Sequence, residues 1–263
     1  MKPIGKMPKA IKKRIRYVLA DIDDTLTLNG RLPAAVFAAM ERVQAAAIRM
    51  VPITGRPAGW CDHIARMWPV DAIVGENGAF YFYYDDRQRK MHRRYFIAEE
   101  QRSTDRNRLA SLKQEILKKV PGCRVSADQS YREADLAIDY CEDVTPLSMA
   151  EVNRIVALFE AAGAQAKISS IHVNGWFGVY DKLTMTRMLF AEVFKDDLEA
   201  VKEDVIFVGD SPNDVPMFQF FPQSVGVANI TKFKEKIQHN PAYVTRQEGG
   251  FGFAEMVDVI LAK

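Results

Sequence analysis

The sequence has few cysteines, little net charge and no long apolar run. Its three cysteines are an odd number and lie far apart, without metal-type spacing, at Cys61, Cys123 and Cys141. We therefore expect reduced thiols in a cytoplasmic protein. The net charge of +2 is too small to indicate binding to nucleic acid or a membrane. No apolar run approaches the roughly 20 residues that cross a bilayer.

Basic residues gather before the first apolar segment, at Lys2, Lys6, Lys9, Lys12, Lys13, Arg14 and Arg16. No apolar run of signal-peptide type lies between these basic residues and the apolar residues 17–20. We interpret them as a frayed, solvated arm, and binding to nucleic acid or an anionic surface is the alternative.

The first apolar segment, 17–20 (YVLA), ends abruptly in Asp21, Asp23 and Asp24, followed by Thr25. Consecutive apolar residues suit a strand that is buried on both faces of a parallel sheet. Acids are seldom buried unless they are paired or bind a metal. The pattern therefore indicates a site at the carboxyl edge of an open α/β sheet. The alternative is an acidic turn in which Asp24 or Thr25 caps the next helix.

Expected strands and helices alternate before and after a central block, which has a different pattern of elements. Before it we expect helix 34–48, strand 49–53, helix 58–67 and strand 70–74; after it, helix 181–194, strand 204–208, helix 215–220 and strand 224–227. This order predicts a doubly wound, Rossmann-like parallel sheet. The block itself mixes a hairpin, helices and alternating strands. We therefore predict an α/β core, 1–83 and 176–263, with an inserted α+β domain at 84–175.

Four short segments follow expected strands or begin helices: DIDDT at 21–25, TGR at 54–56, Lys182 in YDKLT, and GDSPND at 209–214. Their set and order resemble the haloacid dehalogenase-like (HAD) superfamily of phosphohydrolases. The position of the insert corresponds to the type-2 (IIB) cap of that family. The ENGA segment at 76–79 is similar to members that include sucrose-phosphate, mannosyl-phosphoglycerate and broad sugar-phosphate phosphatases.

The resemblance implies a role for each motif. Asp21 would attack phosphorus and form an aspartyl-phosphate. Asp23 would protonate the leaving alcohol and then deprotonate the attacking water. Thr54 and Lys182 would stabilise the phosphoryl oxygens in the transition state. The last two residues also have a purely structural alternative, because Thr54 could cap a helix and Lys182 could be a solvated helix residue.

The resemblance also implies a Mg²⁺ ion, which prefers hard oxygen ligands. Asp21, the Asp23 backbone carbonyl and Asp210 would bind it, and Asp214 would orient water and ligands or bind it directly. The alternative is that Asp210 and Asp214 cap the following helix. Further residues expected beside the metal or the substrate are Gly55, Arg56, Glu76, Asn77, Ser211 and Asn213.

The insert is expected to select the substrate. Alternating polar residues that could meet sugar hydroxyls, or simply form an exposed sheet face, are Ser169, Ser170, His172 and Asn174. A basic patch that we interpret as a solvated hairpin tip, with an anionic substrate group as the alternative partner, consists of Arg87, Arg89, Lys90, Arg93 and Arg94.

The sequence thus predicts a cytoplasmic, Mg²⁺-dependent phosphatase for a small phosphorylated metabolite, in the first place a sugar phosphate. We expect neither nucleic acid nor membrane as a partner. A phosphomannomutase-like enzyme is the nearest rival, since such relatives share the cap position. A non-catalytic phosphoacceptor module is the other, although it has no use for a leaving-group acid such as Asp23.

Overall fold

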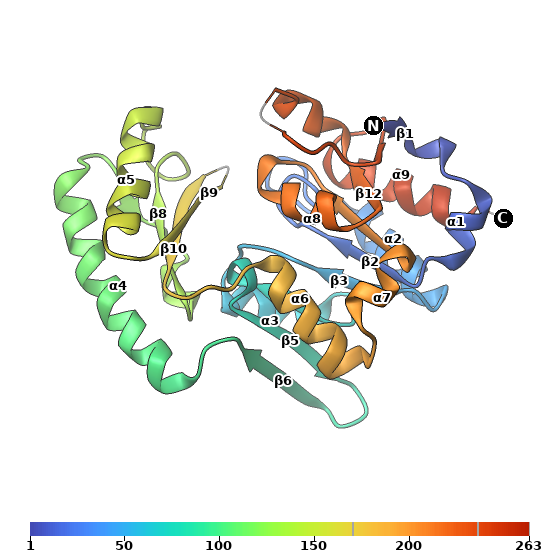
Figure 1. Cartoon of the computed structure of the whole chain (residues 1–263), viewed down its shortest axis with the longest axis horizontal. Helices are drawn as coiled ribbons and strands as arrows, with labels where there is room; N and C mark the ends of the chain where they lie inside the picture. Colours follow the sequence, from blue (N-terminus) through green and yellow to red (C-terminus); the bar gives the residue numbers. More distant parts are fainter. Residues whose placement is uncertain (170, 236, 263) are drawn as a thin grey trace.

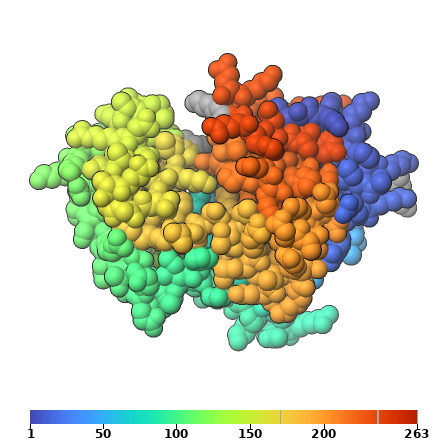
Figure 2. All heavy atoms as spheres, in the orientation of Figure 1, coloured from blue at the N-terminus to red at the C-terminus, as the bar shows by residue number. Residues whose placement is uncertain are grey.

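The structure is a computed structural model that describes residues 1–169, 171–235 and 237–262. The chain forms two lobes, one around a parallel sheet and the other around an antiparallel sheet (Figure 1). Figure 2 shows the two lobes in contact, with a recess between the yellow-green lobe and the orange part of the other lobe. None of the helices in the described ranges is long and apolar enough to cross a membrane.

Parallel strands form the sheet of the first lobe. Their spatial order is β1 (Lys2–Pro3), β13 (Tyr243–Val244), β12 (Gln223–Gly226), β11 (Val205–Gly209), β2 (Tyr17–Ala20) and β3 (Arg49–Pro52). Val18 and Ala20 belong to one apolar cluster, whereas Tyr17 and Leu19 belong to another. Strand β2 is therefore apolar at every position because both faces of the sheet are covered.

Helices cover both faces of this sheet. The cluster around Val18 includes or contacts residues of α1 (Lys9–Arg14), α2 (Ala34–Ala45), α3 (Ala58–Met67) and α9 (Gly249–Leu261). The cluster around Leu19, on the other face, includes or contacts residues of α6 (Lys182–Leu189), the π-helical turn η4 (Phe190–Phe194), α7 (Leu198–Val201) and α8 (Val215–Phe220). The predicted doubly wound α/β fold is confirmed.

A three-stranded antiparallel sheet extends the first lobe. It consists of β4 (Ile73–Gly75), β5 (Phe80–Asp85) and β6 (Lys90–Tyr95). A parallel bridge between Ile53 and Val74 joins it to the end of the main sheet. Strand β6 thus pairs, through β5, with the first lobe, although the sequence places it in the insert. The domain boundaries at 83/84 and 175/176 stay a prediction.

The second lobe is an antiparallel sheet with helices on one face (Figure 1). Its strands lie in the order β7 (Arg124–Val125), β8 (Asp135–Asp139), β10 (His172–Trp176) and β9 (Gln165–Ile168), and its helices are α4 (Glu99–Lys119) and α5 (Met149–Ala161). Leu109, Ile116 and Phe159 pack against Ile138 and Val173 to form a separate apolar core. The predicted α+β character of this block is confirmed.

One local expectation is wrong. The basic N-terminal arm is not frayed, because Lys2 and Pro3 pair with β13 and Ile4 is buried at 1% exposure. Helix α5 begins at Met149, because Ser148 caps it in a reciprocal pair with Glu151.

Candidate active site

The predicted site lies where β2 and β11 end. These strands are parallel neighbours, with Ala20 opposite Val208. Asp21 follows β2 and Asp210 follows β11, so both emerge at the same edge of the sheet. The fold therefore brings together the first and last motifs, which are far apart in the sequence.

Three buried carboxylates gather at this edge. Asp21, Asp210 and Asp214 each offer an oxygen, and these oxygens lie within 4.8 Å of one another. Asp214 Oδ2 accepts hydrogen bonds from the backbone N–H groups of Asp210 at 3.1 Å and Ser211 at 3.4 Å. Asp214 therefore fixes the loop that carries Asp210.

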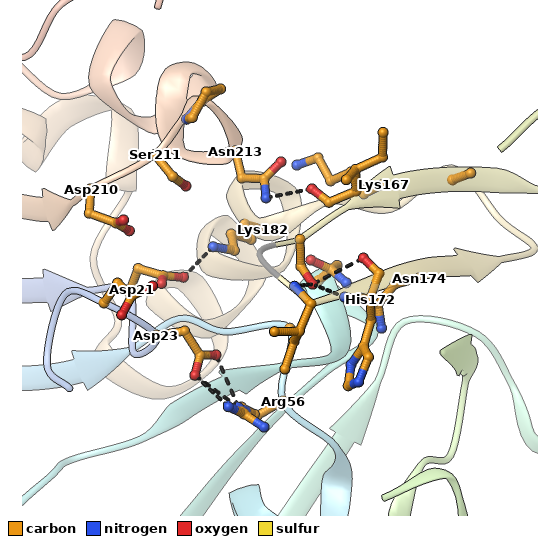
Figure 3. A pocket seen from close by; sticks show the side chains of 18 of the residues that line it. Asp21, Asp23, Arg56, Lys167, His172, Asn174, Lys182, Asp210, Ser211 and Asn213 are labelled. Atoms are coloured by element: carbon orange, nitrogen blue, oxygen red, sulfur yellow. Dashed lines mark hydrogen bonds and ion pairs between the residues drawn. The ribbon is translucent and has the colours of Figure 1, made fainter. Parts of the chain in front are cut away.

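Lys182 enters the cluster from the start of α6, directly after the chain returns from the second lobe. Its Nζ lies 2.5 Å from Asp21 Oδ1 and 3.3 Å from Asp214 Oδ1 (Figure 3). Burial alone would lower the pKa of Lys182, but the carboxylates of Asp21 and Asp214 outweigh burial and raise it. The ammonium group is therefore charged, and Lys182 is not a solvated helix residue.

The acids carry more negative charge than Lys182 balances. Burial raises the pKa of Asp21 to about 7, with Lys182 opposing and Asp214 adding to the rise. Burial, followed by the charges of Asp214 and Asp21, raises the pKa of Asp210 to about 9. A cation at this edge would relieve both effects.

The oxygen donors fit Mg²⁺, which prefers carboxylates and water. Asp214 is already engaged through both oxygens, with Lys182 on one and two amides on the other. Within the described part of the chain, no hydrogen bond reaches Asp21 Oδ2. Asp21 is therefore the carboxylate best able to bind a metal. Asp210 lies beside it and accepts a hydrogen bond from Thr25 Oγ1 on Oδ1 at 3.2 Å, while Asp214 orients its neighbours.

Asn229 is a site residue that the sequence analysis missed. Its Nδ2 donates to Asp210 Oδ2 at 3.2 Å and to the Asp24 carbonyl at 2.9 Å, and its Oδ1 accepts from Gly249 N at 3.0 Å. It lies just beyond β12, at the same sheet edge as the acids. A polar residue shortly after a predicted parallel strand was the signal that could have found it.

Asp23 lies apart from the acid cluster and pairs with Arg56. The guanidinium donates to both carboxylate oxygens, with a shortest distance of 2.6 Å from Nη2 to Oδ1 (Figure 3). Arg56 also stacks on the Trp60 ring, 4.5 Å from its centroid. The Asp23 side chain remains 33% exposed, so solvent or a substrate can reach it.

Thr54 is fully buried after β3 and is not among the described residues that line the cavity. Its N–H donates to the Val74 carbonyl and its Oγ1 accepts from Arg56 N, at 2.9 and 3.0 Å. Pro57 occupies the cap position of α3, so Thr54 does not cap that helix. Its contact with a phosphoryl oxygen stays a prediction.

Glu76 joins the two lobes instead of facing the cavity. It is fully buried, and its carboxylate accepts hydrogen bonds from the backbone of Ala58 in one lobe and of Glu133, Ala134 and Asp135 in the other. Asn77 and Gly55, in contrast, line the cavity as expected.

A cavity of about 680 Å³ lies between the lobes, and the acid site opens into it. Ser211 and Asn213 line it from the first lobe, and His172 and Asn174 from the second. Ser169 also lines it, whereas Ser170 lies outside the described residues. The remaining second-lobe wall is mainly apolar and includes Tyr140, Met149, Val156, Ala166, Ile168 and Ile171.

The basic hairpin patch does not line this cavity. Arg93 pairs with Asp62 at 2.6 Å and Arg94 with Glu192 at 3.2 Å. These pairs favour the structural interpretation of the patch over an anionic substrate arm.

Solved structures share this fold over nearly the whole chain. A Thermoplasma acidophilum protein aligns with a TM-score of 0.72 at 17% identity, covering 94% of this chain and 98% of that one. A haloacid dehalogenase-like hydrolase from Bacteroides thetaiotaomicron aligns with a TM-score of 0.67 at 17% identity, covering 94% of this chain and 100% of that one. The sucrose-phosphatase from Synechocystis sp. PCC6803, solved with sucrose and phosphate, aligns with a TM-score of 0.65 at 13% identity. The alignment covers 93% of this chain and 97% of that one.

No protein-family model and no curated protein sequence matches the chain. At these identities the solved structures establish the fold, which this chain shares with the haloacid dehalogenase-like hydrolase and the sucrose-phosphatase. The resemblance predicted from the four motifs is therefore confirmed at the level of the fold.

Proposed function

We propose that this chain is a Mg²⁺-dependent phosphatase that hydrolyses a small phosphorylated metabolite. The observation that carries the proposal is the cluster of Asp21, Asp210 and Asp214 with Lys182, at the carboxyl ends of adjacent parallel strands and open to a cavity between lobes. Ligands of open α/β sheets bind at this edge.

In the proposed reaction an Asp21 oxygen attacks phosphorus, and the bond from phosphorus to the ester oxygen breaks. Asp23 gives its proton to the departing alkoxide. Asp23 then takes a proton from water, the water oxygen attacks phosphorus, and the bond to Asp21 breaks, which regenerates the carboxylate. Asp23 must leave its pair with Arg56 to perform these proton transfers.

Lys182 opposes the rise in the pKa of Asp21 and would add positive charge beside the transferring group. Asp21, Asp210 and the Asp23 carbonyl would hold Mg²⁺, with Asp214 and Asn229 orienting the acids. The ion would neutralise negative charge on the phosphoryl oxygens.

Sugar phosphates are the first substrate class to test, because the motifs resemble those of sugar-phosphate phosphatases. Several polar groups on the second-lobe wall are already engaged, since Asn174 donates to Asp135 at 3.0 Å and Ser169 exchanges hydrogen bonds with the His172 backbone. An alcohol with an apolar face, such as one side of a sugar ring or an aromatic ring, would suit the apolar remainder of the wall.

The proposed location is the cytoplasm, as the odd number of widely spaced cysteines suggests.

The test measures phosphate release from p-nitrophenyl phosphate and a panel of sugar phosphates, with Mg²⁺ and with EDTA. We expect many turnovers per enzyme molecule with Mg²⁺ and almost none with EDTA. A single turnover would favour the phosphoacceptor rival. Transfer of phosphate between sugar positions, dependent on a bisphosphate and without release, would favour the mutase rival.

A further inference from the structure

We propose that Lys167, on strand β9 of the second lobe, binds the phosphoryl group of the substrate from the side opposite the catalytic acids. This inference rests on the proposed phosphatase function. It assigns part of phosphate binding to the lobe that was expected only to select the alcohol.

Lys167 differs from the other basic residues of the cavity wall in its lack of a counter-ion. Arg56 pairs with Asp23, Arg132 with Asp128 and Asp135, and Lys182 with Asp21 and Asp214. Among the residues that the structure describes, none forms an ion pair or hydrogen bond with the Lys167 side chain, although this residue is only partly exposed and lines the same cavity. A cation in this position is suited to an anion that enters the cavity.

Most of the charges that act on Lys167 belong to the acid site. Burial lowers its pKa, and the positive charge of Lys182 lowers it further, while Asp214, Asp181 and Asp21 act in the opposite direction. The two ammonium groups are therefore close enough to repel each other. A phosphoryl group between them would interact favourably with both.

Strand β9 is held against the acid loop of the first lobe. Asn213 donates from Nδ2 to the carbonyl of Ile168, the residue after Lys167, at 2.9 Å. Figure 3 shows the Lys167 side chain extending from β9 toward the loop of Asn213 and Ser211. Asn213, expected beside the metal, thus positions the strand that carries Lys167.

The experiment compares Lys167→Met, Lys167→Arg and the wild type by calorimetric titration with inorganic phosphate in the presence of Mg²⁺. We expect the phosphate Kd to rise about 10-fold or more in Lys167→Met, because a charge-assisted hydrogen bond is lost. Lys167→Arg keeps the charge and should stay within roughly threefold of wild type. Lys118→Met, the same change on the exposed face of α4, is the matched control and should bind as wild type.

Hydrolysis of two esters shows whether Lys167 binds the phosphoryl group or a second anionic group of the substrate. The KM should rise to a similar extent in Lys167→Met for p-nitrophenyl phosphate and for 3-phosphoglycerate, which also has a carboxylate. An unchanged phosphate Kd with a loss confined to 3-phosphoglycerate would overturn the inference. Wild-type protein that binds no phosphate would overturn it together with the proposed function. Lysine-dependent phosphate binding without hydrolysis by the wild type would contradict only the proposed function.

A melting temperature within a few degrees of wild type shows that Lys167→Met remains folded. If it does not, the Lys167→Gln variant, which keeps a polar side chain, is titrated instead under the same criteria.

Discussion

Two buried acidic clusters lie close together in this protein, and each contains three carboxylates and one strongly basic side chain. The first is Asp21, Asp210 and Asp214 with Lys182. The second, which we call the lobe joint, is Glu76, Asp128 and Asp135 with Arg132. Burial raises the pKa of Asp21 to about 7 and that of Glu76 to about 8. A raised pKa by itself therefore does not distinguish a candidate catalytic site from a structural one.

Hydrogen bonding makes the distinction. In the lobe joint, Glu76 accepts from four backbone amides, and Arg132 donates to Asp128, to Asp135 and to the Gly55 carbonyl of the other lobe. In the first cluster, Asp21 accepts only from Lys182 among the described side chains. The joint satisfies its acids from within the protein, whereas in the first cluster no described residue donates a hydrogen bond to Oδ2 of Asp21, which lines the cavity. We infer that the first cluster is built for a ligand and the second for stability.

Removal of the proposed nucleophile gives the largest expected effect. Asp21→Asn should lower turnover by at least about 10³-fold, because an amide cannot replace the carboxylate as nucleophile. Above about pH 7 the wild-type protein bears the cost of a buried, ionised Asp21, which asparagine avoids. The metal-free variant should therefore be as stable as wild type, or more stable by on the order of 1 kcal/mol.

Phosphate release in the presence of Mg²⁺ measures the loss of turnover. Urea unfolding at pH 8 with EDTA measures the change in stability. Asp258→Asn, on an exposed side chain of α9, is the control and should change neither. Clear destabilisation by Asp21→Asn would mean that the first cluster is structural, like the joint.

The next largest effect concerns the proton transfers assigned to Asp23. Asp23→Asn should slow hydrolysis of alkyl phosphates by about 10²–10⁴-fold. The loss should be much smaller in the first half-reaction with p-nitrophenyl phosphate, because nitrophenolate leaves without a proton. Burst kinetics with both ester types measure this difference. Equal losses for the two esters would contradict a role as general acid.

The lobe joint should respond in the opposite sense from Asp21. Glu76→Gln replaces one acceptor oxygen by an amino group that faces backbone N–H donors, so at least one donor loses its partner. We expect a loss of about 2 kcal/mol in the free energy of unfolding, measured by urea titration. Glu115→Gln, on the exposed face of α4, is the control. An unchanged stability would show that the joint does not need the carboxylate.

The remaining expected effect is a dependence of metal binding on pH. The proposed Mg²⁺ ion would bind the ionised acids, whose pKa values are raised by burial to about 7 for Asp21 and about 9 for Asp210. Protons therefore compete with the ion, and its apparent affinity should fall as the pH is lowered from 9 to 6, by up to about tenfold per unit for each proton displaced. Calorimetric titration with MgCl₂ at several pH values measures this slope. A flat profile would contradict proton competition at these acids.

Much of the site could be predicted because it depends on local sequence. The apolar run 17–20 followed by acids indicates a buried strand with polar groups at its end, and the same holds for 205–210. Parallel strands align their carboxyl ends, so Asp21 and Asp210 could be expected to meet. Lys182 was placed by resemblance of the motif order, and the structure brings its Nζ to Asp21.

Other features depend on contacts between distant segments. Nothing near Glu76 in the sequence reveals that it accepts amides of 133–135, or that Arg56 pairs with Asp23. Lys167 has ordinary sequence surroundings, and only the packing of β9 against the first lobe brings it to the cavity beside the acid site. The sequence by itself determined the α/β fold, its insert and the acids at the strand ends, because strand burial and helix periodicity are local properties. Only the tertiary structure decided which buried charges are balanced by the protein and which are left for a ligand, because that balance depends on donors that meet across the two lobes.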